Sequence, residues 1–188
     1  MRTDLIKMFL EKNKQINLSA IRDADGVFLK HIKDSIELGN VIKLKKWYKV
    51  CDIWTGGWFP LLPLAMTNKD TQFVWIDARR KKVDAVNDMI KDLWLKNVVC
   101  KRSRIEDVDE KFDILTARAV WYVDKIIKWS YNLLEKTWLW ILYKQYSENE
   151  YEDMKEICKK YNISIEKEHR YKLYKDDIER IIYILKKV

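Results

Sequence analysis

The stretch DIWTGGWFP, residues 52–60, decides the fold of this chain. It continues a short apolar run, Lys49–Ile53, that is typical of a β-strand. A strand that leads through a small-residue loop into a helix is how α/β folds hold a nucleotide-like ligand. Glycines in such a loop let the backbone turn tightly and approach the ligand closely. Two tryptophans, Trp54 and Trp58, stand in this loop where the pattern requires glycine.

The composition restricts the class of protein. The length of 188 residues suits one domain, and a hydrophobic content of 48% provides for a sizeable core. No uncharged apolar stretch approaches the roughly 18 residues of a membrane span, and the charged N-terminus is unlike a signal peptide. We therefore expect a cytoplasmic protein without a membrane segment. The wide spacing of the cysteines favours buried reduced thiols over a disulfide or a metal site: Cys51, Cys100 and Cys158.

The charge balance favours an anionic partner. The formal net charge is +8, and such a charge attracts polyanions, RNA and DNA first among them. Charge alone leaves the partner open, because lysine-rich genomes encode basic proteins of every kind. Two basic runs are candidate phosphate-binding surfaces or, equally, solvated helix faces: Lys43, Lys45 and Lys46, and Arg79, Arg80, Lys81 and Lys82.

The hydrophobic periodicity changes after residue 47. Residues 1–47 show helical spacing, whereas short apolar strands alternate with helices from residue 48 onward. This alternation indicates βαβ units around a parallel sheet. The expected strands are Lys49–Ile53, Phe73–Asp77, Asn97–Lys101, Phe112–Ala117 and Leu139–Lys144. The expected helices are Leu61–Met66, Arg79–Leu93, Val123–Leu134 and Glu148–Tyr161.

The C-terminal end departs from a plain dinucleotide-binding fold. Two strands follow one another, Ile163–Tyr171 and Ile178–Lys187, with a turn near residues 175–177. The sequence thus predicts an α/β fold with a mostly parallel sheet that an antiparallel hairpin closes. We divide the chain into an N-terminal helical extension, residues 1–47, and one compact unit, residues 48–188.

Several ordered motifs resemble one family of methyltransferases. The segment NLSAIRD, residues 17–23, is similar to N-L-T-x-I/V-R-D, and KHIKDS, residues 30–35, to (R/K)-H-I-x-D-S. Residues 52–63 resemble D-(I/V)-G-(T/S)-G-x-G-(F/L)-P-G-(I/L)-P, and SRIE (103–106) and TARA (116–119) complete the set. The chain is therefore similar to the RsmG/GidB family of 16S rRNA (guanine-N7) methyltransferases. These enzymes belong to the class I S-adenosylmethionine (SAM) methyltransferases, with a Rossmann-like seven-stranded sheet.

The resemblance implies methylation of N7 of a guanine in 16S rRNA of the small ribosomal subunit, by a cytoplasmic monomer that uses SAM. Guanine N7 carries an in-plane lone pair and no proton, so its attack on the sulfonium methyl needs no general base. Catalysis would rest on positioning in a desolvated site. No residue is assigned a catalytic role beyond positioning, with Arg118 the one candidate, and no metal site is expected. The target guanine must be unpaired or turned out.

The resemblance also assigns cofactor-binding residues. Asp77 would accept both ribose hydroxyls. An Asp after a strand, seen alone, is usually a helix cap, but its spacing from the first loop favours the ribose role. Ile105 would pack on the adenine, and Glu106 would flank it or act as a helix N-terminal acid. Arg118 would hold the cofactor carboxylate or an RNA phosphate, or form a plain surface salt bridge. The complete set is Trp54, Gly56, Phe59, Asp77, Ile105, Glu106 and Arg118.

Four further residues lie near the expected site. Asp52, at a strand end, would orient the loop or the cofactor amine, or is a solvated turn carboxylate. Lys144 ends the fifth expected strand and is a candidate for RNA binding. His31 and Asp34 lie one helical turn apart and could pair. Packing of the N-terminal helices over the site is the favoured role for these two.

Six tryptophans stand where the family has glycine or a small residue. The chain has nine tryptophans and four glycines, whereas average usage predicts roughly 13 glycines. One hypothesis explains all six, namely UGA codons that the source organism reads as glycine. A degenerate protein that has lost its cofactor and an engineered one are the alternatives. The six are Trp54 and Trp58 in the loop, Trp75 at a strand end, Trp94 and Trp121 at helix ends, and Trp138 in a turn.

Two other functions compete with the methyltransferase. One is an RNA-binding protein on a catalytically dead methyltransferase scaffold, with Trp54 and Trp58 plugging the cofactor pocket. The other is a nicotinamide-dependent dehydrogenase, which the terminal hairpin and the segment around Arg118 disfavour. Binding of SAM separates the first from the enzyme.

Overall fold

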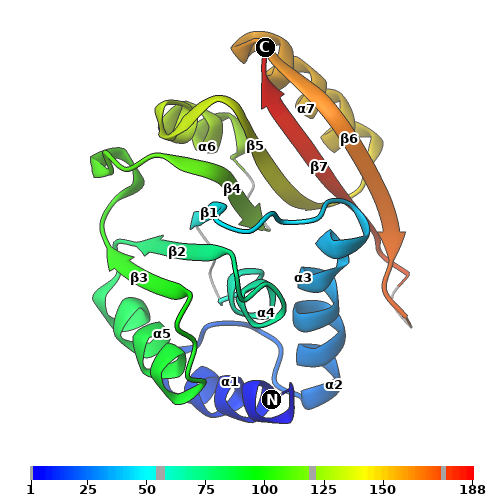
Figure 1. Ribbon diagram of the computed structural model, residues 1–188. Helices are drawn as coiled ribbons and strands as arrows, with labels where there is room; N and C mark the ends of the chain where they lie inside the picture. The colour runs from blue at the N-terminus through cyan, green and yellow to red at the C-terminus, as the bar shows by residue number, and fades with distance from the viewer. Residues whose placement is uncertain (1, 54–57, 119–121, 175–176) are drawn as a thin grey trace.

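The computed structural model describes the chain except residues 1, 54–57, 119–121 and 175–176. Its centre is a seven-stranded sheet with the order β3-β2-β1-β4-β5-β7-β6 (Figure 1). The strands from β3 to β5 are parallel, and β7 pairs antiparallel with both β5 and β6. The strands are β1 (Lys49–Ile53), β2 (Gln72–Asp77), β3 (Val98–Arg102), β4 (Phe112–Arg118), β5 (Leu134–Gln145), β6 (Ile163–Lys172) and β7 (Glu179–Lys187). The predicted mostly parallel sheet with a C-terminal hairpin is confirmed.

Helices precede β1 and connect the strands. The run before β1 is α1 (Arg2–Ile16), α2 (Ala24–Val27), the π-helical turn η1 (Phe28–Lys33), α3 (Asp34–Ile36) and the 3₁₀ turn η2 (Glu37–Asn40). The connecting elements are α4 (Leu61–Thr67), α5 (Arg80–Asp92), η3 (Ile105–Asp107), α6 (Val123–Ser130), η4 (Tyr131–Leu133) and α7 (Glu148–Tyr161). Nearly every expected element is present within one or two residues of its predicted bounds.

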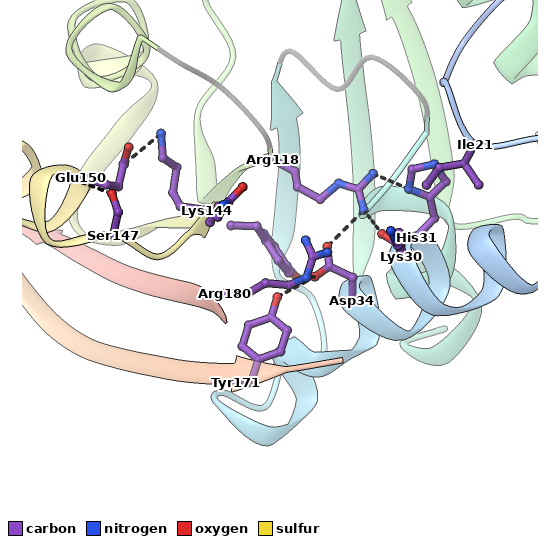
Figure 2. Close-up of a pocket in the computed structure, with 12 residues that line it drawn as sticks. Ile21, Lys30, His31, Asp34, Arg118, Lys144, Ser147, Glu150, Tyr171 and Arg180 are labelled. Atoms are coloured by element: carbon purple, nitrogen blue, oxygen red, sulfur yellow. Dashed lines mark hydrogen bonds and ion pairs between the residues drawn. The ribbon is translucent and has the colours of Figure 1, made fainter. Parts of the chain in front are cut away.

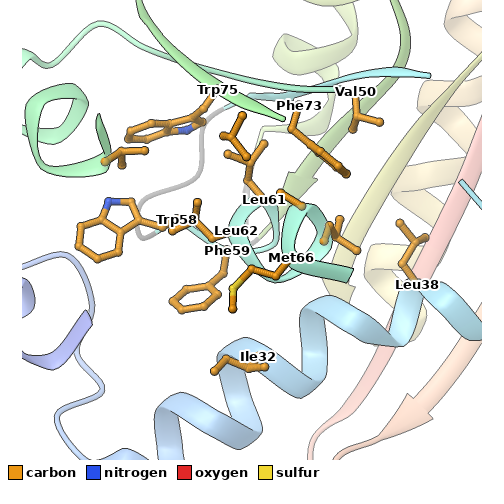
Figure 3. Close-up of a cluster of buried hydrophobic side chains, with 14 of the residues drawn as sticks. Ile32, Leu38, Val50, Trp58, Phe59, Leu61, Leu62, Met66, Phe73 and Trp75 are labelled. Carbon is orange, nitrogen blue, oxygen red and sulfur yellow. The ribbon is translucent and has the colours of Figure 1, made fainter. Parts of the chain in front are cut away.

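Both faces of the sheet are buried, which explains the near-continuous apolar runs of the central strands. Successive residues of a strand point to opposite faces: Val50 of β1 belongs to the core under α1, α4 and α5, and its neighbour Cys51 to the core under α6 and α7. Figure 3 shows part of the first core, around Phe59, Leu61 and Phe73.

Strand β5 is longer than its sequence predicts. It begins at Leu134 rather than Leu139, so α6 ends at Ser130 instead of running to Leu134. The polar letters EKT at 135–137 conceal the strand in the sequence. In the structure Leu134 pairs with Phe112 of β4, and the register then shifts before Leu139. The strand therefore begins at the pair of Leu134 with Phe112, which the side-chain pattern does not reveal.

Three tryptophans adopt the left-handed backbone conformation that favours glycine. They are Trp47 (φ 71°), Trp58 (φ 70°) and Trp94 (φ 52°). Trp94 follows the last residues of α5: its N–H donates to Lys91 O at 3.0 Å, and Leu95 N–H donates to Ile90 O at 3.0 Å. This is the Schellman arrangement, whose left-handed position is usually glycine. The sequence pattern identifies two of these three positions and misses Trp47.

The other expected glycine positions differ in kind. Trp75 lies inside β2 rather than at its end, and Trp138 lies within β5 rather than in a turn. Trp54 and Trp121 fall outside the described residues. The left-handed requirement thus supports the glycine hypothesis at Trp58 and Trp94, and does not extend to Trp75.

Two buried tryptophans are poorly accommodated by the core. Trp58 and Trp75 are 1% and 0% exposed (Figure 3), and among the described residues neither indole N–H has a hydrogen-bond partner. A buried indole N–H usually finds one. Trp140, also fully buried, donates its Nε1–H to Ser130 Oγ at 2.9 Å. Trp140 does not stand at an expected glycine position, and its indole N–H has a hydrogen-bond partner. The indole N–H groups of Trp58 and Trp75 have none among the described residues.

The cysteines, the helix lengths and the clustering of metal-binding side chains can be compared with what the composition predicts. All three cysteines are buried free thiols, as predicted. No described helix is long and apolar enough to cross a bilayer. Within the described ranges, His, Cys, Asp and Glu side chains form no cluster suited to a metal ion.

Candidate functional site

A first cavity lies at the carboxyl ends of β1, β2 and β3. We call it the Asp77 cavity; it has a volume of about 380 Å³, and its walls include Ile53, Asp77, Ile105, Glu106 and Ile126. The crevice outside the carboxyl ends of parallel strands is where open α/β sheets bind ligands. The structure therefore brings three of the predicted cofactor residues, Asp77, Ile105 and Glu106, into one cavity.

Asp77 is the one carboxylate at the end of β2. Its side chain is only 8% exposed, and Oδ1 accepts the backbone N–H of Arg79 at 2.8 Å and the Arg79 guanidinium at 3.3 Å. Asp77 thus holds the turn that leads into α5, the cap-like role that the sequence left open. These bonds also fix the carboxylate in the wall of the cavity, where a diol could reach it.

Ile105 and Glu106 form the 3₁₀ turn η3 after β3. The side chain of Ile105 is half-buried and packs on the core beneath α6 and α7. Glu106 is exposed beside it. An apolar side chain next to a polar rim suits the flat face and the polar edge of a heterocyclic base.

A second cavity, of about 490 Å³, lies at the carboxyl ends of β4 and β5. We call it the Arg118 cavity. Arg118, the last residue of β4, donates from Nη2 to His31 Nδ1 at 2.9 Å and from Nη1 to Asp34 Oδ2 and Lys30 O, both at 3.2 Å (Figure 2). Its side chain is 14% exposed. The surface salt bridge considered from sequence is therefore a largely buried network that joins β4 to the N-terminal helices.

His31 is neutral in this network. Burial, and secondly the Arg118 guanidinium, lower the pKa of His31 from 6.5 to about 3. A guanidinium only donates, so Nδ1 of the neutral ring must accept, and the proton sits on Nε2. Nε2 lies 2.9 Å from Ser19 Oγ, to which it donates. The hydrogen bonds thus fix both the tautomer and the orientation of the ring.

Asp34 is the anionic centre of the same network. It is 3% exposed; Oδ1 accepts from the Tyr171 hydroxyl at 2.7 Å and lies 3.7 Å from Arg180 Nε, while Oδ2 faces Arg118. Burial, followed by the Asp34 carboxylate, raises the pKa of Tyr171, which keeps the hydroxyl a donor. Among the described contacts the side chains of His31 and Asp34 both bind Arg118 rather than each other. The predicted direct side-chain pair is thus replaced by a shared cation.

The Phe59 ring packs against one face of the His31 ring. The two rings stack at 4.6 Å with an interplanar angle of 15°, and Arg118 lies 5.6 Å from the Phe59 centroid. Phe59 is 1% exposed, so its predicted contact with the methionine end of SAM stays a prediction. Trp54 and Gly56 lie outside the described residues. Asp52 is fully buried in β1, so its interpretation as a solvated turn carboxylate is wrong.

Several residues of the Arg118 cavity carry no signal in a linear motif. Tyr171 and Arg180 come from the hairpin strands β6 and β7, and Glu150 from the first turn of α7. Ser19 is inside a quoted motif, yet its bond to His31 depends on Asn13, which is 1% exposed and bonds the backbone of Ser19. The one sequence signal for this hydrogen bond is that Asn13, a polar residue, lies on the buried face of the first helix.

The basic runs are partly neutralised. Lys46 pairs with Asp70 at 3.2 Å, Arg80 with Asp84 at 3.6 Å, and Arg79 with Asp77. The first two pairs are exposed, and exposed ion pairs contribute little to stability. Their use as an RNA surface stays a prediction.

Comparisons with known proteins agree with this geometry. The sequence matches the family described as GidB, rRNA small subunit methyltransferase G, over residues 2–179. Proteins named ribosomal RNA small subunit methyltransferase G are similar to it: 35% identity in Flavobacterium johnsoniae (66% of this chain, 59% of that protein), 27% in Lysinibacillus sphaericus (97% and 79%) and 32% in Legionella pneumophila strain Lens (75% and 67%). The alignment thus spans about three fifths of the first relative.

Solved structures share the fold at low identity. A SAM-dependent methyltransferase from Aquifex aeolicus superposes with a TM-score of 0.65 at 16% identity, covering 93% of this chain and 97% of that one. TYW2 from M. jannaschii in complex with AdoMet gives 0.64 at 17% identity, with 84% and 76% covered. These likenesses show the Rossmann-like fold of SAM-dependent methyltransferases. The match over residues 2–179, together with this fold, shows that the chain belongs to the GidB family of rRNA small subunit methyltransferases.

Proposed function

We propose that this protein transfers the methyl group of SAM to N7 of a guanine in 16S rRNA, within the small subunit or its precursor. One observation carries the proposal: Asp77, Ile105 and Glu106 meet in one cavity at the carboxyl ends of β2 and β3, next to a second cavity at β4 and β5. The family match supports the nature of the reaction and of the RNA. A cytoplasmic monomer is the state we infer for such an enzyme.

The described residues fit SAM. Asp77 offers a fixed, little-exposed carboxylate to the two ribose hydroxyls, and charge-assisted hydrogen bonds of this kind are strong. Ile53, Ile105 and Ile126 offer apolar walls to the adenine. When bound, SAM supplies an electrophilic methyl on its sulfonium.

The chain itself contributes positioning. Arg118 is held by His31 and Asp34 so that its guanidinium stays fixed at the end of β4. A preorganised cation there can orient a carboxylate or a phosphate without a reorganisation cost during the reaction. Guanine N7 needs no proton removed, which agrees with a neutral His31 that is occupied at both ring nitrogens.

The alternative of a dead scaffold is not favoured. Trp58, which that alternative places in the cofactor pocket, instead packs edge-on against Phe9 at 5.3 Å in the core. It is not among the residues that line the two described cavities.

The test is methyl transfer to small subunits from a strain that lacks the modification. Purified protein, as the printed chain and as the double variant Trp54→Gly with Trp58→Gly, is incubated with labelled SAM and subunits, and the rRNA is digested for mass spectrometry. We expect 7-methylguanosine at one position, and its absence after Asp77→Ala. Label in another nucleoside, or no label with either form, would refute the proposal.

A further inference from the structure

An ion pair lines the Arg118 cavity opposite the Arg118 network. Lys144 of β5 places Nζ 2.9 Å from Oε1 of Glu150, in the first turn of α7. Their side chains are 8% and 25% exposed, and both belong to the cavity wall. Figure 2 shows the pair on one side of the cavity and Arg118, His31 and Asp34 on the other.

The Asp34 carboxylate, on the Arg118 side of the cavity, is already committed to internal contacts. Asp34 faces three donors, Arg118, Tyr171 and Arg180. This carboxylate is required to compensate the buried cations around it, because its loss would leave them without a counter-charge. It is therefore not available to bind a base. The carboxylate that remains in the wall, more exposed and with one oxygen in the ion pair, is that of Glu150.

We propose that Lys144 and Glu150 recognise the Watson–Crick edge of the guanine to be methylated, an inference that rests on the proposed function. Guanine presents, side by side, the O6 acceptor, the N1–H donor and the N2 amino donor. An ammonium donates to O6, and a neighbouring carboxylate accepts from N1–H and N2–H. Adenine presents an acceptor at N1 and a donor at N6. Its N1 would therefore face the carboxylate and its amino group the ammonium, so neither hydrogen bond could form.

The chemistry of N7 methylation favours this edge. N7 lies on the other edge of the base, and a site that bonded N7 would block its lone pair. Recognition through the Watson–Crick edge leaves N7 open to the methyl donor. It also requires an unpaired guanine, since pairing would occupy that edge.

A bare phosphate fits this wall less well. Glu150 places a negative charge beside Lys144 and would repel an anion. A cavity of about 490 Å³ with mixed donors and acceptors also exceeds what one phosphate needs. Phosphate binding is therefore an outcome that the experiment must distinguish.

Glu150 is not required to cap α7. The helix is capped by Ser147, whose Oγ accepts the N–H of Glu150 at 3.2 Å. A capping box would also use the Glu150 carboxylate, but the described ion pair directs it to Lys144. The backbone N–H and the Ser147 cap survive the substitution Glu150→Gln, so this variant is expected to fold.

The experiment measures binding of three short single-stranded RNAs that differ only at one position, which is guanosine, inosine or adenosine. Inosine keeps N7, N1–H and O6 and lacks only the N2 amino group. The proteins are the unaltered chain, Glu150→Gln, and the matched control Glu152→Gln. Glu152 lies on the same helix and pairs with exposed Lys155 at 2.9 Å. Melting temperatures of all three confirm folding.

We expect the unaltered protein and Glu152→Gln to bind the guanosine RNA about 10-fold more tightly than the inosine RNA, and adenosine RNA more weakly still. In Glu150→Gln the guanosine and inosine affinities should converge to within about 2-fold, since the amide cannot accept from both N1–H and N2–H. Adenosine RNA should stay the weakest ligand, because Lys144 still faces the N6 donor. Equal weakening of all three RNAs by Glu150→Gln would indicate backbone binding and overturn the proposal. A guanosine-over-inosine preference that Glu150→Gln leaves intact, or an unaltered protein without that preference, would overturn it too.

Methyl transfer to the same RNAs separates the two proposals, because inosine retains N7. Guanosine preference in binding, together with no methyl transfer to these RNAs or to small subunits, would refute the proposed function and leave base recognition standing. Transfer at equal rates to guanosine and inosine RNAs would do the reverse.

Discussion

The two cavities of this protein lie at the same edge of one sheet but are built in opposite ways. The Asp77 cavity is lined by the ends of neighbouring strands, the turns after them and helix α6, with Asp77 fixed by its neighbour Arg79. The Arg118 cavity gathers residues from the N-terminal helices to the last strand, and its charges hold one another. The first is a local site on a finished fold, whereas the second is also part of what holds the fold together.

The largest expected effect tests this difference directly. Asp34→Asn removes the charge between Arg118 and Arg180, and leaving buried cations without their carboxylate should cost about 3–5 kcal/mol of unfolding free energy. Denaturant unfolding measures it. The exposed Asp25 of α2 gives the control, since Asp25→Asn should change stability by less than about 0.5 kcal/mol. A loss of under about 1 kcal/mol in Asp34→Asn would show that the network is not structural.

The opposite behaviour is expected in the Asp77 cavity. Asp77→Asn keeps a carbonyl for the Arg79 backbone N–H but loses one acceptor for a ribose diol. SAM affinity by calorimetry should fall about 10- to 100-fold, or about 1.4–2.8 kcal/mol, with little change in stability. Asp84→Asn on α5, which alters an exposed pair with Arg80, should leave SAM binding unchanged. Unfolding of Asp77→Asn as severe as that of Asp34→Asn would erase the distinction between the cavities.

Acid should weaken the Arg118 cavity through His31. The folded pKa of His31, about 3, lies below the usual 6.5, so the unfolded chain binds the proton first as the pH falls. The stability that a neutral His31 contributes is complete above about pH 6.5 and is lost as the pH falls toward about 3. By about pH 5 the loss should amount to about 2 kcal/mol of unfolding free energy. Stability against pH in His31→Gln, whose carbonyl can still accept from Arg118, should lack this component. Parallel curves for the two proteins would contradict it.

The smallest effect lies outside both cavities. Trp94 is 85% exposed and left-handed, so Trp94→Gly loses little burial and relieves about 1–2 kcal/mol of backbone strain. We expect the melting temperature to rise by about 2–8 °C, with SAM affinity unchanged. Trp94→Ala, which keeps a Cβ, should gain much less. Equal gains for both variants would exclude the backbone explanation.

The sequence predicts the Asp77 cavity because its logic is local. Apolar β-branched runs mark β1 to β4, and parallel strands end at one edge, so Asp77 and Ile105 are expected to meet. The early start of β5 is hidden in the sequence, because residues 135–137 are polar and the register with β4 shifts between Leu134 and Leu139. Strands can thus be predicted from the sequence where burial on both faces makes them apolar.

The Arg118 cavity is not predictable in the same way. Tyr171 and Arg180 reach Asp34 because β7 inserts between β5 and β6, and no periodicity in the sequence states that order. His31 and Asp34 have helical spacing that indicates a pair, whereas a cation from β4 lies between them in the structure. Charge networks across distant segments depend on topology, which a single sequence states only indirectly.

The left-handed tryptophans at positions 47, 58 and 94 have a consequence for how this gene is expressed. If their codons are UGA, a host that takes UGA as a stop signal yields only the first helices, and one that inserts tryptophan yields the printed chain. A host that inserts glycine yields a third product with relaxed turns at these three positions. The translation machinery of the host would then select among these products of one gene, and a stability measured for any one of them would belong to that decoding alone.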